Sequence, residues 1–310
     1  MYDQQNPQNI KKFRLALTVR NRTLILSVIL TLSLWNVAPF ARGQALVPYT
    51  PPLDSEQLKQ TGLGLLEEAA QLTRFQQYQL ALPRAELATQ LAPDSYQAWA
   101  LLGSLYLQLD ELDKGIEFLQ KAKTLEPKDP GIQFILGEAY FKKGDYQKSV
   151  QFLEAALKLD PKVPGALFDL GNAYYQLGRL EEAILQYEKA FAQESSLWPA
   201  INNVGLVKYE QGEIDTAISK WRQAIKIDPK AAEPLLALAV ALYIKGESQE
   251  ALSLGETALR LDSRYADFDH LKENLWGDRL LKDTEKFLAN PQIQQVLGQV
   301  QDTQPTPPSP

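Results

Sequence analysis

Residues suited to catalysis or metal binding are scarce in this sequence. It contains no cysteine, which excludes thiolate metal ligands, a cysteine nucleophile and disulfides. Its one histidine, His270, stands close to Asp267, Asp269 and Glu273, so a lone metal site and an ordinary surface histidine are the two interpretations, of which the sequence favours the second. No pairing of a nucleophile with a base is visible. We therefore predict no catalytic residue, no metal ion and no cofactor.

Two other patterns resemble binding motifs only in part. Gly62-Leu63-Gly64 follows Lys59-Gln60-Thr61 rather than an apolar strand, and no later residue completes a phosphate-binding loop. Glu67-Glu68 and Glu181-Glu182 are adjacent pairs, and neighbours on a helix do not face each other. We interpret the first pattern as a helix turn and the pairs as solvated helix faces. The sequence predicts neither an enzyme nor a small-molecule substrate.

Charge divides the chain into two parts. Of the 310 residues, 45% are apolar and 23% are charged, which is typical of a soluble globular protein. Residues 1–45 hold six of the 32 basic residues and one of the 38 acidic ones, which gives a net charge of +5 there and −11 on the remainder. Nucleic acid is not an expected partner of the acidic part, because phosphate binding needs a basic face.

The basic N-terminal part contains a predicted targeting segment. Its basic residues precede an uncharged stretch over 23–41, and Gly43-Gln44-Ala45 provides a small-x-small cleavage pattern, as in a signal peptide. As an uncleaved helix the stretch would rise roughly 28 Å, close to the hydrocarbon thickness of a bilayer. A cleaved signal peptide over 1–45 and a membrane anchor both remain open. In either case the basic flank predicts that the rest of the chain lies on the extracytoplasmic side. A Pro-rich linker is expected over 46–54.

The rest of the chain is organised by a period of 34 residues. One column of small residues comprises Ala88, Ala122, Ala156, Ala190, Ala224 and Ala258. A second comprises Gly103, Gly137, Gly171 and Gly205, continued by Ala239. Within each unit, apolar residues recur at helical spacing on both sides of a turn that usually contains glycine. We therefore predict helix–turn–helix units over 55–263, in which small residues allow close helix packing.

The units resemble the tetratricopeptide repeat (TPR), a 34-residue helix–turn–helix. The residues that match its pattern are Trp99, Leu102, Gly103, Tyr106, Ala122 and Pro127, with a second set at Leu170, Gly171, Tyr174, Ala183, Tyr187 and Ala190. The resemblance covers six units over residues 62–263, and it departs from the pattern at Pro83, Ala239 and Gly255. It implies an all-α fold, a right-handed superhelical TPR solenoid that follows an N-terminal hydrophobic helix. Residues 264–290 are expected to form C-terminal capping helices, and the Gln-rich residues 291–310 a disordered tail.

The resemblance also implies a concave groove lined by the first helix of each unit, with the fifth, ninth and twelfth positions pointing inward. The candidate partner-binding residues on and beside these columns are Phe134, Phe141, Phe168, Asn172, Tyr175, Asn202, Asn203, Tyr209 and Tyr243. The aromatic rings are expected to bury apolar side chains of a partner, and the amides to hydrogen-bond its backbone. Alternatively, some of these rings, Phe134 and Phe168 in particular, belong to the core between repeats.

We therefore expect a non-catalytic scaffold or adaptor that binds a protein or peptide segment. The alternative is a structural component of a cell-envelope or secretion complex, and an enzyme ranks third. The layout, with residues 271–278, also resembles the Pitt-like TPR assembly factors of photosynthetic membranes. A thylakoid or plasma membrane is accordingly the expected location, although a cytoplasmic partner would conflict with the predicted orientation.

Overall fold

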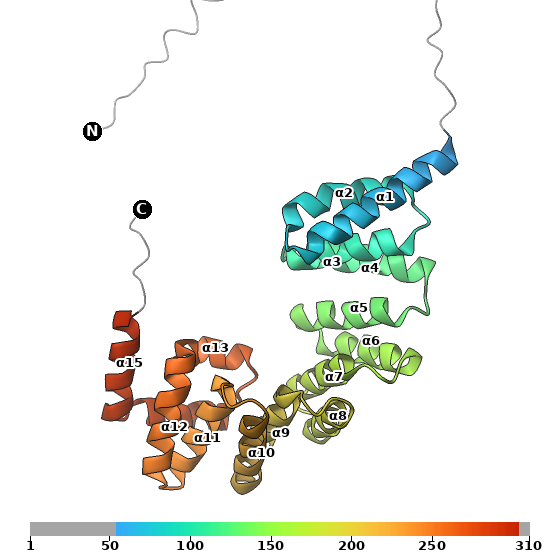
Figure 1. Cartoon of the computed structure of the whole chain (residues 1–310). Coiled ribbons are helices and arrows are strands. Elements are labelled where there is room, and N and C mark those ends of the chain that lie inside the picture. The colour runs from blue at the N-terminus through green and yellow to red at the C-terminus, as the bar shows by residue number, and fades with distance from the viewer. Residues whose placement is uncertain (1–53, 304–310) are drawn as a thin grey trace, which may run out of the picture. The chain divides into compact units, whose positions relative to one another are not determined.

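The computed structural model describes residues 54–303, and all regular structure in that range is helical (Figure 1). The predicted targeting segment and nearly all of the predicted linker lie outside the described residues, as do residues 304–310. None of the described helices is both long enough and apolar enough to cross a membrane.

Twelve of the described helices form six consecutive hairpins. They are α1 (Ser55–Arg74), α2 (Tyr78–Leu91), α3 (Tyr96–Gln108), α4 (Leu112–Leu125), α5 (Pro130–Lys142), α6 (Tyr146–Leu159), α7 (Pro164–Gln176), α8 (Leu180–Gln193), α9 (Trp198–Glu210), α10 (Ile214–Ile227), α11 (Ala232–Ile244) and α12 (Ser248–Leu261). Each helix packs most extensively on the other member of its hairpin, and the second helix of one hairpin also packs on the first helix of the next. The prediction of an all-α repeat solenoid is confirmed.

The turns within the hairpins follow from the glycines seen in the sequence. Gly144, Gly178, Gly212 and Gly246 have φ angles between +71° and +87°, a region that other residues adopt only with strain. Asp110 takes the same position between α3 and α4 with φ of 62°. Between hairpins, α6 and α10 end one residue before Asp160-Pro161 and Asp228-Pro229, because the residue before proline disfavours the helical conformation.

The glycine column allows close contacts between the two helices of a hairpin. A Cβ atom on Gly171 would lie 2.5 Å from Cε1 of Tyr187, and one on Gly205 would lie 2.5 Å from Nε1 of Trp221. At Gly103 and Gly137 the obstructing residues are Leu119 and Leu153. In each case a side chain of the second helix lies over bare backbone of the first. The alanine column is almost completely buried, which confirms its packing role.

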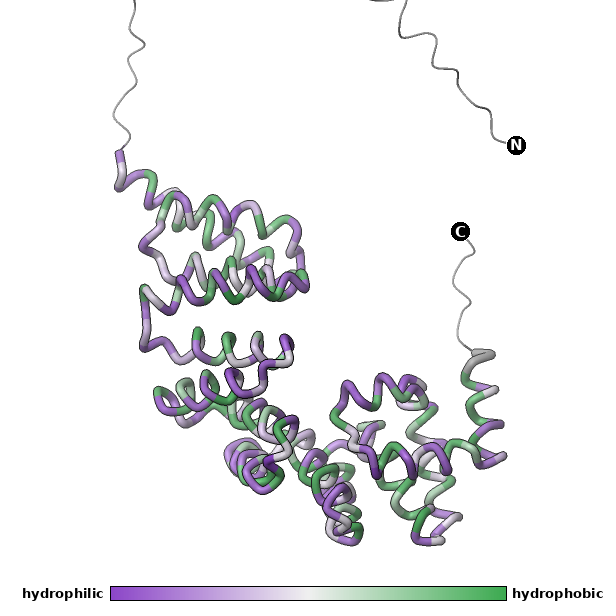
Figure 2. Tube along the Cα trace, turned by 180° about the vertical axis from the view of Figure 1, so that it is seen from behind, coloured by the Kyte–Doolittle hydropathy of each residue, from purple (hydrophilic) through white to green (hydrophobic). Residues whose placement is uncertain are grey.

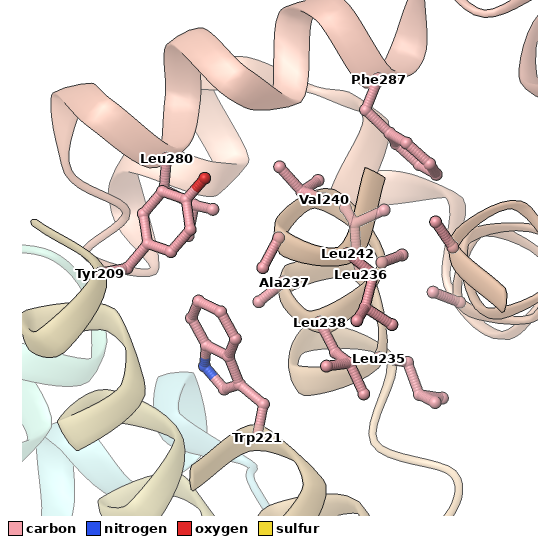
Figure 3. Packing of buried hydrophobic residues seen from close by; sticks show 14 of the residues in the cluster. Tyr209, Trp221, Leu235, Leu236, Ala237, Leu238, Val240, Leu242, Leu280 and Phe287 are labelled. Carbon is pink, nitrogen blue, oxygen red and sulfur yellow. The ribbon is translucent and has the colours of Figure 1, made fainter. Parts of the chain in front are cut away.

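The hydrophobic core is a series of clusters along the chain rather than one centre. Figure 2 shows apolar and polar residues interspersed along the repeat helices, as expected of helices that bury one face. Helix α11 is the exception, since its residues from Ala232 to Leu242 are all buried. It lies between Trp221 of α10 on one side and Leu280 and Phe287 on the other (Figure 3).

Four short elements follow the hairpins. They are η2 (Ser263–Ala266), α13 (Phe268–Glu273), α14 (Asp278–Leu288) and α15 (Pro291–Thr303). Helix α14 packs on α9 and α11, whereas α15 packs mainly on α12.

The prediction of a disordered tail over 291–310 is wrong for residues 291–303, which form α15. Ile293 and Val296 are buried, and Leu297 and Val300 pack partly against the same cluster. These residues recur at helical spacing, so their burial against α12 stabilises a helix in a segment whose many glutamines suggested disorder.

Candidate partner-binding surface

The first helices of successive hairpins form one continuous face. Helices α3, α5 and α7 contact one another in turn, and α9 and α11 continue the series beneath α14. We call the face built from α3, α5, α7, α9 and α11 the inner surface. The predicted partner-binding residues all lie on α5, α7, α9 and α11.

The part of the inner surface on α9 and α11, the covered half, is occupied by α14. Tyr209 is completely buried, and its hydroxyl donates a hydrogen bond to Oδ2 of Asp283 at 2.8 Å. Tyr243 remains partly exposed and packs edge-on against Phe287, with ring centroids 5.4 Å apart. The carboxylate of Glu210 accepts hydrogen bonds from the backbone N–H groups of Arg279 and Leu280, at 3.1 and 3.0 Å. It therefore caps the N-terminus of α14.

The three predicted amides form an internal network. Oδ1 of Asn172 accepts hydrogen bonds from the Tyr187 hydroxyl at 2.8 Å and from Nδ2 of Asn203 at 3.1 Å. Nδ2 of Asn202 donates in turn to Oδ1 of Asn203 at 3.2 Å. Asn202 and Asn203 are 0% and 7% exposed, so they do not reach a partner's backbone as expected. The hydrogen bond from Asn203 to Asn172 joins α9 to α7 instead. The Tyr209 ring is completely buried, so the expectation that it contacts apolar side chains of a partner is also wrong.

The network continues to a buried carboxyl group. Glu233 is 7% exposed and accepts a hydrogen bond from Nε1 of Trp276 at 3.1 Å. Burial raises the pKa of Glu233 to about 7, although its bonds to Trp276 and Asn202 act in the opposite direction. Near neutral pH a large share of Glu233 is thus protonated, and a protonated carboxyl can donate a hydrogen bond that a carboxylate cannot.

We expect Glu233→Gln to reduce the loss of stability at alkaline pH. A carboxyl group whose pKa is raised on folding contributes its full stability below its unfolded-state pKa, and this contribution is lost as pH rises through the folded-state value. The parent should therefore lose on the order of 1–3 kcal/mol through this group between about pH 4.5 and 8. Urea unfolding at pH 5 and pH 8 measures the difference between parent and variant.

One control variant accompanies this measurement. Glu117→Gln, at an exposed glutamate of α4, should leave the pH dependence of the parent unchanged. Asp169 also has a raised pKa and contributes a slope of the same sign, so some pH dependence should persist in Glu233→Gln. An identical slope in parent and Glu233→Gln contradicts the assignment of a protonated Glu233.

The part of the inner surface on α3, α5 and α7, the open half, keeps its aromatic residues partly exposed. Phe134, Phe141, Phe168 and Tyr175 each pack against the hydrophobic cluster of α6 to α9 while keeping part of the ring accessible. Phe168, for example, contacts Tyr187 with ring centroids 5.7 Å apart. The two interpretations of the aromatic column are therefore compatible, because the rings join the inter-repeat core and also present an edge to solvent.

Tyr175 marks the boundary between the two halves. Burial raises its pKa, and the charges of Glu210 and Asp278 raise it further, which places its ring near the start of α14. The open half therefore begins where α14 begins and extends over α7, α5 and α3.

Sequence reasoning did not assign a role to two carboxyl groups of the open half. Burial raises the pKa of Asp169 to about 7, and the nearby charge of Glu138 raises it further. Burial also raises the pKa of Glu138, against the effect of Lys142. Glu138 lines a pocket of about 260 Å³ between α3 and α5, together with Ser104, Leu107, Gln108, Ile135, Ala139 and Lys142. Asp169 follows Phe168, the fifth residue of α7, and so stands one position outside the predicted inward columns.

His270 shows no arrangement suited to a metal ion. Its ring packs edge-on against Tyr265, with centroids 4.9 Å apart, and Nε2 lies 3.4 Å from Nδ2 of Asn274. Across residues 54–303 no three His, Cys, Asp or Glu side chains are grouped as a metal site would require.

Stacked helical hairpins with a continuous inner surface define a helical-repeat protein. Residues 137–178 and 205–246 match a TPR repeat family, and residues 164–196 and 96–129 match two further tetratricopeptide repeat families. The chain is a tetratricopeptide-repeat protein. Such repeats generally act as non-catalytic modules that bind proteins, and their first helices form the binding surface.

Comparison with solved structures supports the same fold. PilW, described as a widely conserved type IV pilus biogenesis factor, matches with a TM-score of 0.60 and 19% identity over 77% of this chain and 99% of its own. PilF of Pseudomonas aeruginosa matches with a TM-score of 0.59 and 16% identity over 71% and 98%. MamA of Desulfovibrio magneticus RS-1 matches with a TM-score of 0.50 and 20% identity over 56% and 97%. No curated protein matches in sequence.

Proposed function

We propose that the protein is a non-catalytic scaffold that binds a segment of another protein on the open half of its inner surface and so assists the assembly or localisation of that partner. The observation that supports this is the row of partly exposed aromatic rings on α5 and α7, at the 34-residue step of the repeat. Apolar rings that recur on one accessible face are typical of interaction sites. The covered half supports no such role, because α14 already occupies it.

A double substitution tests this proposal. Phe141→Ala with Tyr175→Ala should weaken partner binding at least tenfold, or roughly 1.4 kcal/mol, because both rings lose their contact area. The partner is first identified by affinity purification from membrane and soluble fractions, and its affinity is then measured by calorimetry with purified proteins.

The matched control is Phe75→Ala, which removes a ring that is 67% exposed at the end of α1. This variant should bind as the parent does. Undiminished binding by a folded double variant shows that the partner docks elsewhere. Unfolding of the double variant would instead assign both rings to the core alone.

The location of the protein is a further part of the proposal. The basic residues before the uncharged stretch over 23–41 support an extracytoplasmic solenoid, held by an anchor or released after cleavage. A reporter fused after Pro310 should then be active outside the cytoplasm, and a mature N-terminus at Leu46 would establish cleavage. A reporter active only in the cytoplasm contradicts the orientation and favours the Pitt-like resemblance, which stays a prediction.

The second candidate is a structural role in a cell-envelope complex. The likeness in fold to PilW, described as a pilus biogenesis factor, favours it. Recovery of envelope machinery rather than a single partner in the affinity purification supports this alternative.

A further inference from the structure

The chain itself shows what kind of segment the inner surface accommodates. On the covered half, α14 is an amphipathic helix whose buried residues Leu280, Asp283, Thr284 and Phe287 recur at i, i+3, i+4 and i+7. Leu280 and Phe287 belong to the same hydrophobic cluster as α11 (Figure 3). Asp283 accepts the hydrogen bond from Tyr209. The inner surface of α9 and α11 therefore binds one face of a helix.

The open half repeats the columns that hold α14. Phe141 and Tyr175 stand at the positions of Tyr209 and Tyr243, twelfth in their helices. The open half also continues directly from the covered half, since Tyr175 lies near the start of α14. A second helix can therefore be placed on α3, α5 and α7 as α14 is placed on α9 and α11.

The two halves differ in charge at the centre of the surface. The ninth positions of α9 and α11 are Leu206 and Val240, which are apolar and buried. The ninth position of α5 is Glu138, which lines the pocket between α3 and α5. Asp169 lies on the neighbouring first helix α7, and the charge of Glu138 raises its pKa. Neither carboxylate forms a hydrogen bond or salt bridge with a described residue. Lys142, one turn from Glu138, compensates only part of this charge.

Two unpaired carboxylates on a half-buried surface disfavour an acidic or purely apolar occupant. An apolar occupant would desolvate both groups further without pairing them, which is strongly unfavourable for their charged forms in a low-dielectric site. A lysine or arginine would pair with them and remove their mutual repulsion. The charge at the centre of the surface therefore decides between occupants of similar shape.

We propose that the open half binds an amphipathic helix of a partner protein that carries lysine or arginine at the positions facing Glu138 and Asp169. This inference rests on the proposed function and adds to it the class of partner and the two residues that select it. Phe141 and Tyr175 supply the apolar contacts, as Tyr209 and Tyr243 do for α14.

Three labelled helical peptides of 16 residues test the inference by fluorescence anisotropy with the full chain. They share leucine and phenylalanine at i, i+4 and i+7 and differ only at the inward polar positions, which carry lysine, glutamine or glutamate. The lysine peptide should bind at least tenfold more tightly than the glutamate peptide. In the double variant Glu138→Gln with Asp169→Asn, this preference should disappear. The variant should fold, because neutral amides replace two carboxyl groups whose charged forms are disfavoured by burial.

The matched control is Glu117→Gln with Glu256→Gln, which changes the net charge equally but lies on second helices, α4 and α12. It should keep the preference for lysine. Equal binding of all three peptides, binding of none, or a preference that survives in the Glu138→Gln, Asp169→Asn variant overturns the inference. The proposed function fails separately, when Phe141→Ala with Tyr175→Ala leaves binding of the purified partner unchanged.

Discussion

Phe287→Ala should lower the free energy of unfolding of the C-terminal part by about 3–5 kcal/mol, the usual cost of truncating a buried phenylalanine. The ring is completely buried. It lies against the bare backbone of Gly255 in α12 and against the ring of Tyr243 in α11. No small rearrangement closes the resulting cavity, because the contacting atoms belong to two packed helices.

The effect of Phe287→Ala should also be local. Because repeats contact mainly their neighbours, hydrogen exchange should increase in α11 to α15 and remain as in the parent in α1 to α6. Phe75→Ala, at a ring that is 67% exposed, is the control and should change stability by less than about 0.5 kcal/mol. A uniform increase in exchange along the chain would show that the solenoid unfolds as one unit.

Gly171→Leu should destabilise the middle of the solenoid by about 1–3 kcal/mol or more, because even a Cβ atom there would overlap the Tyr187 ring. Tyr187 cannot easily move, since it is buried and its hydroxyl donates a hydrogen bond to Asn172. The measurement is urea unfolding followed by circular dichroism.

A glycine of another helix provides the control. Gly64 in α1 has no atom within 4 Å of an added Cβ. Gly64→Ala should therefore raise stability by up to about 1 kcal/mol through helix propensity, whereas Gly171→Ala should lower it. If alanine raised stability at both positions, helix propensity rather than close packing would determine the effect at Gly171.

Local rules explain why the repeats were predictable from the sequence. A turn that needs positive φ selects glycine, as at Gly144 and Gly178, and a hairpin that packs closely selects a small residue, as at Gly171. Each requirement recurs with every unit, so it appears in the sequence as a column. The inward aromatic column was predictable for the same reason.

The placement of α14 was not predictable in this way, because it depends on contacts between residues about seventy positions apart, such as Glu210 with Leu280. Such contacts occur once and leave no period. One local signal did exist. Gly255 stands where the repeat usually has an aromatic residue, and Phe287 of α14 lies over that position. The burial of Tyr209 follows from the same placement of α14, whose Asp283 accepts its hydrogen bond.

The dimensions of α14 indicate how long a helix the inner surface can accommodate. Eleven residues of α14, a length of roughly 16 Å at 1.5 Å per residue, extend over two first helices. The three first helices of the open half therefore accommodate about 16 residues by the same measure. A segment bound on the open half as proposed would meet the start of α14 near Tyr175, so α14 would fix one end of that segment in addition to completing the fold.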